Sequence, residues 1–112
     1  MSDAMIFRKP VIATRYSGNL EFMNDGNSWL VNCSVETIRS ADRYQLFDGG
    51  MKWAYVDEEH LGELMVSAVT NRRSQAVLDR INQASVDIRR FDSQSVGQRI
   101  RARLDQIVTA HF

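Results

Sequence analysis

The segment 9–31, KPVIATRYSGNLEFMNDGNSWLV, restricts the fold more than any other part of the sequence. It opens with the short apolar run PVIAT at residues 10–14, where proline stands first and its missing N–H does least harm to a strand ladder. Val11, Ile12 and Ala13 show no alternation of apolar and polar side chains. That pattern is typical of a strand buried on both faces in a parallel sheet covered by helices. The segment therefore predicts an α/β fold whose first strand is residues 10–14.

The residues after this strand favour a turn with room for an anion. Ser17, Gly18 and Asn19 are small, so backbone N–H groups between the strand end and a following helix stay accessible, and the helix dipole favours negative charge there. Arg15 places a fixed positive charge close by. A second interpretation stays open, because Ser17 and Asn19 are also ordinary helix caps.

Two acidic residues likewise have both a functional and a purely structural interpretation. Glu21 is a candidate catalytic or ligand-binding carboxylate, and Asp3 is a candidate ligand contact near the start of the chain. Both also lie where a helix begins, and the helix dipole favours acids in a first turn whatever their function.

The rest of the chain predicts one more strand, a loop and a series of helices. Leu20, Phe22 and Met23 begin a short helix that NDGN at 24–27 ends, and residues 28–32 form a second strand. A short helix is expected within residues 1–8, with Ser2 as its cap and Met5 and Ile6 facing inward. Residues 33–52 show no sustained period, so we expect mostly loop with a helical turn near 34–38, followed by an extended piece at 53–56.

Three helices are expected in the second half. Asp57 caps the first, and residues 71–74 separate it from the second. Asp92 or Ser93 caps the third. Its apolar stripe consists of Val96, Ile100, Leu104, Ile107 and Val108.

Charge and cysteine content limit the classes of function. The chain has no net charge, but residues 1–70 carry six Lys/Arg against ten Asp/Glu, and residues 71–112 carry eight Arg against four Asp. The single cysteine, Cys33, excludes an internal disulfide, and no closely spaced pair of metal ligands exists. No apolar run approaches membrane-spanning length and no signal-peptide pattern opens the chain, so we expect a soluble cytoplasmic protein without a metal.

PVIAT, the SGN turn, EFM and NSWLV resemble the carboxy-terminal domain of GT-B glycosyltransferases of the family-4 type, which use nucleotide-sugar donors. The similarity continues through WAYVDEEHLGELM and RRFDSQSVGQRIRARL, so it covers nearly the whole chain. It implies a single domain, 1–112, that is the last part of a Rossmann-like domain: a small parallel sheet flanked by helices in residues 1–56, and a helical section in residues 57–112.

The resemblance also implies roles for particular residues. The SGN turn, Ser17 to Asn19, would hold the donor diphosphate together with Arg15, and Glu21 matches a position that is commonly acidic in the family. Asp3 matches a ribose-binding Glu, with a side chain shorter by one methylene. A second family Glu, associated with the transferred sugar, would precede Met1. The implied chemistry is retaining sugar transfer without an obligatory metal or other cofactor, and no residue here is assigned a catalytic role.

Two hypotheses about function follow. The first is a glycosyltransferase-related carboxy-terminal fragment with a residual nucleotide-sugar site, inactive alone. The alternative is a small protein–protein interaction module, or one subunit of a split glycosyltransferase. Since two or three short strands form a marginal sheet, we expect a homodimer or a partner chain that supplies the missing half. Nucleic-acid binding through Arg89, Arg90, Arg99, Arg101 and Arg103 is disfavoured, because acidic residues lie between these arginines.

Overall fold

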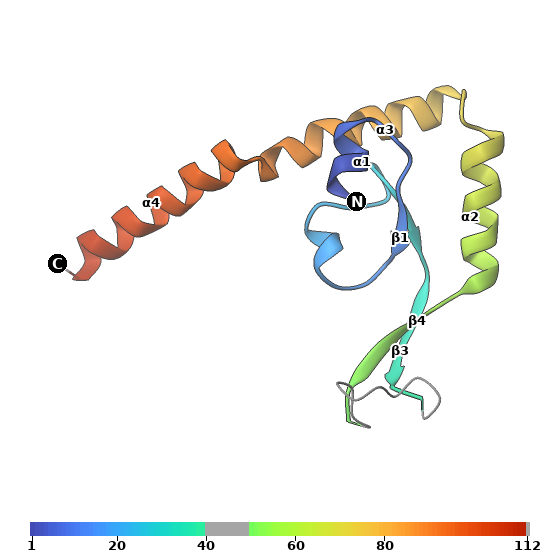
Figure 1. Ribbon diagram of the computed structural model, residues 1–112, viewed down its shortest axis with the longest axis horizontal. Coiled ribbons are helices and arrows are strands. Elements are labelled where there is room, and N and C mark those ends of the chain that lie inside the picture. Colours follow the sequence, from blue (N-terminus) through green and yellow to red (C-terminus); the bar gives the residue numbers. More distant parts are fainter. Residues whose placement is uncertain (40–49, 112) are drawn as a thin grey trace.

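The computed structural model describes residues 1–39 and 50–111 of the 112-residue chain. Its elements, in order, are α1 (Ser2–Ile6), β1 (Ile12–Thr14), the 3-10 helix η1 (Ser17–Glu21), β2 (Trp29–Val31), β3 (Cys33–Thr37), β4 (Lys52–Val56), α2 (Glu58–Thr70), α3 (Gln75–Asp87), the 3-10 helix η3 (Ile88–Phe91) and α4 (Ser93–His111). The fold is mixed α/β with a small parallel sheet and helices, as predicted (Figure 1).

The parallel sheet consists of β1 and β2, in the register Ile12 to Trp29 through Thr14 to Val31. The N–H of Trp29 donates to the carbonyl of Val11 at 3.0 Å, and the N–H of Arg15 donates to the carbonyl of Val31 at 2.8 Å. The strands predicted at 10–14 and 28–32 are both present, each two residues shorter. All three residues of β2 are buried. Burial on both faces was predicted for the first strand, and there it holds only for Val11, because all three residues of β1 are half-buried.

A β-hairpin stands where the sequence predicted mostly loop. β3 pairs antiparallel with β4, from Cys33 opposite Val56 to Thr37 opposite Lys52. The predictions of a loop beginning at residue 33 and of a helical turn near 34–38 are therefore wrong, whereas the extended piece at 53–56 is confirmed. Ladder hydrogen bonds to a distant strand hold this exposed, polar segment, and local propensity carries no signal of them. Residues 40–49 of the predicted loop lie outside the described residues.

Side-chain caps set the starts of the later helices. The carboxylate of Asp57 accepts a 3.0 Å hydrogen bond from the N–H of His60, which confirms Asp57 as the cap of α2. The carboxylate of Asp92 accepts a 2.6 Å bond from the N–H of Ser95, so Asp92 rather than Ser93 caps α4. The first helix differs from its prediction: α1 begins after Met1 without a side-chain cap, and Ser2 lies inside it.

The core lies where α1, β1, β2 and the end of α3 meet. Its buried residues are Met5, Val11, Met23, Leu30, Ala84 and Ile88. Met5 is fully buried, as predicted, but Ile6 is 55% exposed, so that part of the prediction is wrong. A helix of five residues turns only one narrow face inward, and α1 ends at once: Arg8 takes a left-handed conformation, and the N–H of Lys9 donates to the carbonyl of Ala4 at 2.8 Å.

The chain is more extended than a typical domain of its length. Its radius of gyration is 18.5 Å, whereas a compact domain of this size has about 13 Å. Figure 1 shows the reason: α4 continues away from the end of α3 and leaves the rest of the molecule. The exposed fractions of Ile100, Leu104 and Val108 on α4 are 55–56%. The predicted apolar stripe of this helix is therefore mostly exposed in the described structure, and only Val96, near η3, is half-buried.

None of the helices in residues 1–39 and 50–111 is long and apolar enough to cross a membrane.

Candidate functional site

The turn that follows β1 has an unusual backbone. Tyr16 is extended, and Ser17 then takes a φ of 72°, in the left-handed region that non-glycine residues seldom occupy. The 3-10 helix η1 starts at Ser17 and ends at Glu21. The sequence predicted a helical turn beginning near Leu20 and continuing to the NDGN segment. The structure corrects this: the helix is of the 3-10 type, starts three residues earlier and ends before Phe22.

Within the SGN turn, the three residues differ in their surroundings. Ser17 and Gly18 are exposed, and a β-carbon at Gly18 would meet no atom within 4 Å. Asn19 is half-buried, and its Nδ2 donates to the carbonyl of Thr14 at 2.9 Å. Asn19 therefore closes the end of β1 with its side chain, which is a structural task, while Ser17 and Gly18 face open space.

Arg15 does not present a free positive charge. Its guanidinium donates two hydrogen bonds to the carboxylate of Asp25, at 3.0 Å and 2.6 Å, in a bidentate arrangement. This contact holds the pKa of Asp25 below its usual 3.8 and raises the pKa of Arg15. The predicted anion-binding cation is thus neutralised by a residue that the sequence indicated only as part of a helix stop. The sequence feature that was missed is Asp25, an acid ten positions after Arg15 that the turn brings next to it.

The two predicted acidic residues, Glu21 and Asp3, do not lie together in one site. The backbone carbonyl of Glu21 accepts a hydrogen bond from the guanidinium of Arg90, while its side chain is exposed. Asp3 lies on α1, which packs against α3 and η3. No hydrogen bond or ion pair among the described residues joins Asp3 to the turn, so the structure groups residues 15–21 and leaves Asp3 apart.

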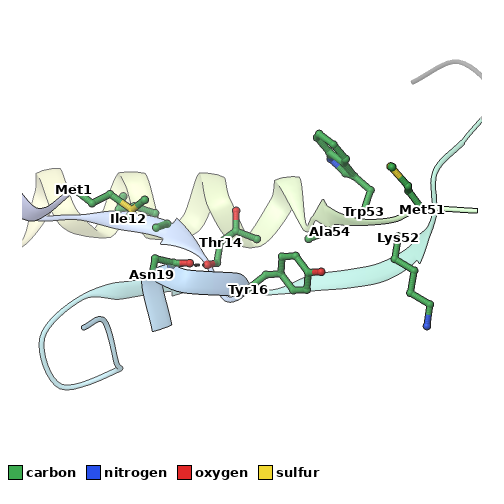
Figure 2. A pocket seen from close by; sticks show the side chains of 10 residues that line it. Met1, Ile12, Thr14, Tyr16, Asn19, Met51, Lys52, Trp53 and Ala54 are labelled. Atoms are coloured by element: carbon green, nitrogen blue, oxygen red, sulfur yellow. Dashed lines mark hydrogen bonds between the residues drawn. The ribbon is translucent and has the colours of Figure 1, made fainter. Parts of the chain in front are cut away.

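An open groove of about 890 Å³ runs beside β1. It is lined by Met1, Ile12, Ala13, Thr14, Tyr16, Asn19, Met51, Lys52, Trp53 and Ala54. Figure 2 shows that these side chains come from the start of the chain, from β1 and the turn after it, and from β4. Its volume lies within the range of about 300–1,000 Å³ that is typical of ligand sites. The sequence signalled β1 and the turn, but the contribution of β4 was missed because the hairpin was not predicted.

A buried asparagine fixes the loop between η1 and β2. Asn27 is 1% exposed. Its Nδ2 donates to the carbonyl of Phe22 at 3.0 Å and to the carboxylate of Asp87 at 2.8 Å, and its Oδ1 accepts from the N–H of Asn24 at 2.8 Å. All its polar atoms are satisfied, so this residue holds the loop that carries Asp25, and through it Arg15, against α3.

The arginines near the carboxyl end have structural contacts. Arg90 binds the carbonyl of Glu21, and Arg99 donates to the carbonyl of Arg90 at 2.7 Å. Both guanidinium groups also lie over the ring of Phe91, at 4.9 Å and 5.5 Å from its centroid. The two halves of the chain carry opposite net charge, yet both ion pairs of the described residues, Arg15–Asp25 and Arg39–Glu36, lie within the first half.

No group of three or more His, Cys, Asp or Glu side chains in the described part of the chain is arranged to hold a metal ion.

Comparisons with protein-family models, with curated proteins and with solved structures found no match to this chain.

Proposed function

We propose that this chain is a glycosyltransferase-related carboxy-terminal piece, with a nucleotide-sugar site at residues 15–21 that binds the donor diphosphate but does not catalyse transfer alone. The observation that carries the proposal is the backbone at the carboxyl end of β1. Ligands of open α/β sheets bind at the carboxyl ends of parallel strands. There Ser17 adopts a left-handed conformation and starts a helix whose first N–H groups have no partner inside it.

The chemistry of the turn suits a diphosphate. The N–H groups of Ser17, Gly18 and Asn19 and the hydroxyl of Ser17 supply donors, and the open space at Gly18 allows phosphate oxygens to approach the backbone closely. Arg15 is within the same segment, and its guanidinium fork fits two phosphate oxygens as well as it fits a carboxylate. Asp25 must release Arg15 for this contact, so binding of the anion competes with an existing ion pair.

The groove beside the turn supports a ligand larger than a phosphate. The groove's volume of 890 Å³ is sufficient for a nucleotide sugar. Tyr16, in the turn after β1, and Lys52, on β4, both line it. Asp3 is proposed as a ribose contact by resemblance alone. Glu21 is proposed as a sugar or phosphate neighbour on the same ground, because its exposed carboxylate makes no contact that identifies a role.

Two features support the absence of activity in the isolated chain. The leaving diphosphate needs positive charge that is present in the transition state, and Arg15 is already paired with Asp25. The parallel sheet of the described residues also has only two strands, where a nucleotide-binding domain has several.

The test is a titration of the protein with UDP, GDP and their sugar conjugates, followed by amide NMR shifts. We expect saturable shifts confined to residues 15–21, with a smaller change at Asp3. Gly18→Val should abolish them, since its side chain would occupy the open space that the phosphate needs. Gly62→Ala is the matched control, because a β-carbon there also meets no atom within 4 Å and lies on α2. Absence of shifts at millimolar ligand would refute donor binding.

A specific observation favours interaction with another protein as a second function. The apolar stripe of α4 is solvent-exposed in the described structure, and a shallow pocket of about 360 Å³ is lined by Val96, Arg99, Ile100, Arg103 and Leu104 on this helix. Exposed apolar patches of this kind mark surfaces where another chain docks. We propose that the partner is a polypeptide that supplies the missing amino-terminal half.

Co-expression with an amino-terminal half of a family-4 glycosyltransferase tests this second function. The two chains should co-purify, and Leu104→Asp should prevent it. Gln98→Asp places the same charge on a different, exposed side of α4 and should leave the complex intact. Equal loss with both variants would contradict a specific role for the apolar stripe.

A further inference from the structure

The outer face of α2 is complementary to itself, and we propose that two copies of this chain dimerise by antiparallel packing of their α2 helices, with the two-fold axis between Met65 and Val66. This face is separate from the phosphate turn and from the stripe of α4, and no residue of α2 lines the groove beside β1. The inference does not depend on either function proposed above.

The opposite, inner face of α2 is fixed on the body of the molecule. The helix contacts β1 and β2, with Ala68 buried and Leu61 and Leu64 half-buried. In its first turn, Nδ1 of His60 accepts a hydrogen bond from the N–H of Asn32 at 3.1 Å. The outer face therefore points away from the sheet, and Figure 1 shows α2 along one margin of the molecule.

The middle of the outer face is apolar although it is exposed. The exposed fractions of Met65, Val66 and Val69 are 55%, 67% and 65%. Gly62, Val66 and Val69 recur at intervals of four and three residues, so they line one stripe of the helix, with Met65 beside it. This spacing is the one at which two helices pack along a common seam. An exposed apolar stripe of this kind indicates a surface that another helix covers.

The charges at the two ends of α2 indicate that the covering helix is a second α2 in antiparallel orientation. Glu58 and Glu59 are exposed in the first turn. Arg72 and Arg73 are exposed in the turn after the helix, and the guanidinium of Arg72 donates to the carbonyl of Val69 at 3.1 Å, which keeps its charge at the helix end. In an antiparallel pair the acidic start of each helix meets the basic end of the other, whereas a parallel pair places acid against acid.

The register centred between Met65 and Val66 also matches the side chains in size. Gly62 of one copy lies beside Val69 of the second copy, and Met65 lies beside Val66. A β-carbon at Gly62 would meet no atom within 4 Å, so there is open space for the valine of the second copy. The same register brings the two acids of each helix beside the two arginines of the other.

The resulting assembly is a closed dimer. Both copies use the same patch, so the contact does not continue into a chain of molecules. Glu59 and Arg73 belong to neither of the two ion pairs of the described residues, so both charges are available to a second copy. Because a single pair of 13-residue helices is a small interface, we expect a dissociation constant in the micromolar range.

The first test is sedimentation equilibrium of the full chain between micromolar and millimolar concentrations. The parent chain should form a dimer and no larger species. Val66→Glu places two carboxylates at the axis and should raise the dissociation constant by about tenfold or more. Val86→Glu is the matched control, because Val86 is 61% exposed on α3, and it should dimerise like the parent chain. A parent chain that stays monomeric at millimolar concentration, or equal weakening by both variants, would overturn the proposal.

The second test reverses the charges at the ends of the helix. Glu59→Arg and Arg73→Glu each place like charges beside each other at both ends of the pair, and each should weaken the dimer about three- to tenfold. The double variant Glu59→Arg/Arg73→Glu restores the attraction with its polarity reversed, so its dissociation constant should return to within about threefold of the parent value. Absence of recovery in the double variant would refute the antiparallel register.

Disulfide cross-linking locates the two-fold axis. In a Cys33→Ser background, which has no other cysteine, Val66→Cys should form a disulfide between two copies under mild oxidation, because this position meets itself at the axis. Glu59→Cys should not, since its counterpart in the second copy lies at the far end of the pair. Faster cross-linking of Glu59→Cys than of Val66→Cys would indicate a parallel pair and overturn the proposal.

Discussion

Asn27 and Asp87 stand 60 positions apart in the sequence and are joined by a hydrogen bond of 2.8 Å between Asn27 Nδ2 and Asp87 Oδ2. This bond connects the loop after η1 to the last residue of α3. Because Asn27 is buried and Asp87 ends a helix of the second half, the contact fixes the helical section to the loop that leads from the candidate site to β2.

Replacement of Asn27 by alanine should destabilise the fold strongly. It removes the partner of the carbonyl of Phe22 and of the N–H of Asn24, and it leaves the carboxylate of Asp87 with its hydrogen bond from Gln83 alone. We expect the free energy of unfolding to fall by about 2–4 kcal/mol in chemical denaturation. Asn82→Ala on the exposed side of α3 is the control and should change stability by less than about 0.5 kcal/mol. Similar effects of both variants would show that the hydrogen bonds of Asn27 do not stabilise the fold.

Release of Arg15 should strengthen the binding of anions to the turn. Asp25→Asn removes the negative charge that neutralises the guanidinium, while the fold loses only an exposed ion pair, worth about 0–1 kcal/mol. We expect the affinity for UDP to rise about three- to tenfold, measured by calorimetry. Arg15→Gln in the same background should cancel the gain. An unchanged affinity in Asp25→Asn would remove Arg15 from the proposed site.

The left-handed backbone at Ser17 predicts that valine and glycine at this position affect the free energy of unfolding differently. A left-handed conformation costs a non-glycine residue about 1–2 kcal/mol, and a β-branched residue more. Ser17→Val should therefore lower the free energy of unfolding by about 1–2 kcal/mol. Ser17→Gly should maintain or raise it, since relief of strain offsets the greater freedom of the unfolded chain. Thermal unfolding of the two variants checks this, and a destabilised Ser17→Gly would argue against the observed φ.

The start of α4 should melt in acid because of its cap. Hydrogen bonds from Ser95 hold the pKa of Asp92 below its usual 3.8 in the folded chain. A depressed pKa means that the unfolded state takes up the proton more readily. The stabilisation by Asp92 is therefore complete above about pH 4 and is lost as the pH falls through the lower pKa of the folded state.

The amide signal of Ser95, followed by NMR between about pH 6 and pH 2, measures this loss. Asp92→Asn keeps a capping side chain without a titrating group, so its Ser95 signal should be independent of pH in that range. A pH-dependent signal in Asp92→Asn would assign the effect to another group.

The parts of the fold that were predictable are those with local signals. The apolar run of β1, the caps at Asp57 and Asp92, and the periodic helices are encoded by neighbouring residues. β3 was not predictable, because its exposed residues alternate weakly and its structure depends on pairing with β4. At the site, the SGN turn was visible in the sequence. The neutralisation of Arg15 by Asp25 and the contribution of Trp53 to the groove were not, since each needs the chain to fold back on itself.

Because α4 projects from the rest of the molecule, a small rotation at its first residues becomes a large displacement at its far end. This helix has 19 residues and is joined to the body through η3, where it makes its contacts. A helix of that length measures about 28 Å, so a rotation of about 10° at η3 displaces its far end by about 5 Å. A fluorescent label near Thr109 would thus magnify small rearrangements around Phe91 into distance changes that energy transfer can follow. The end of the chain is the natural place from which to observe events at the core.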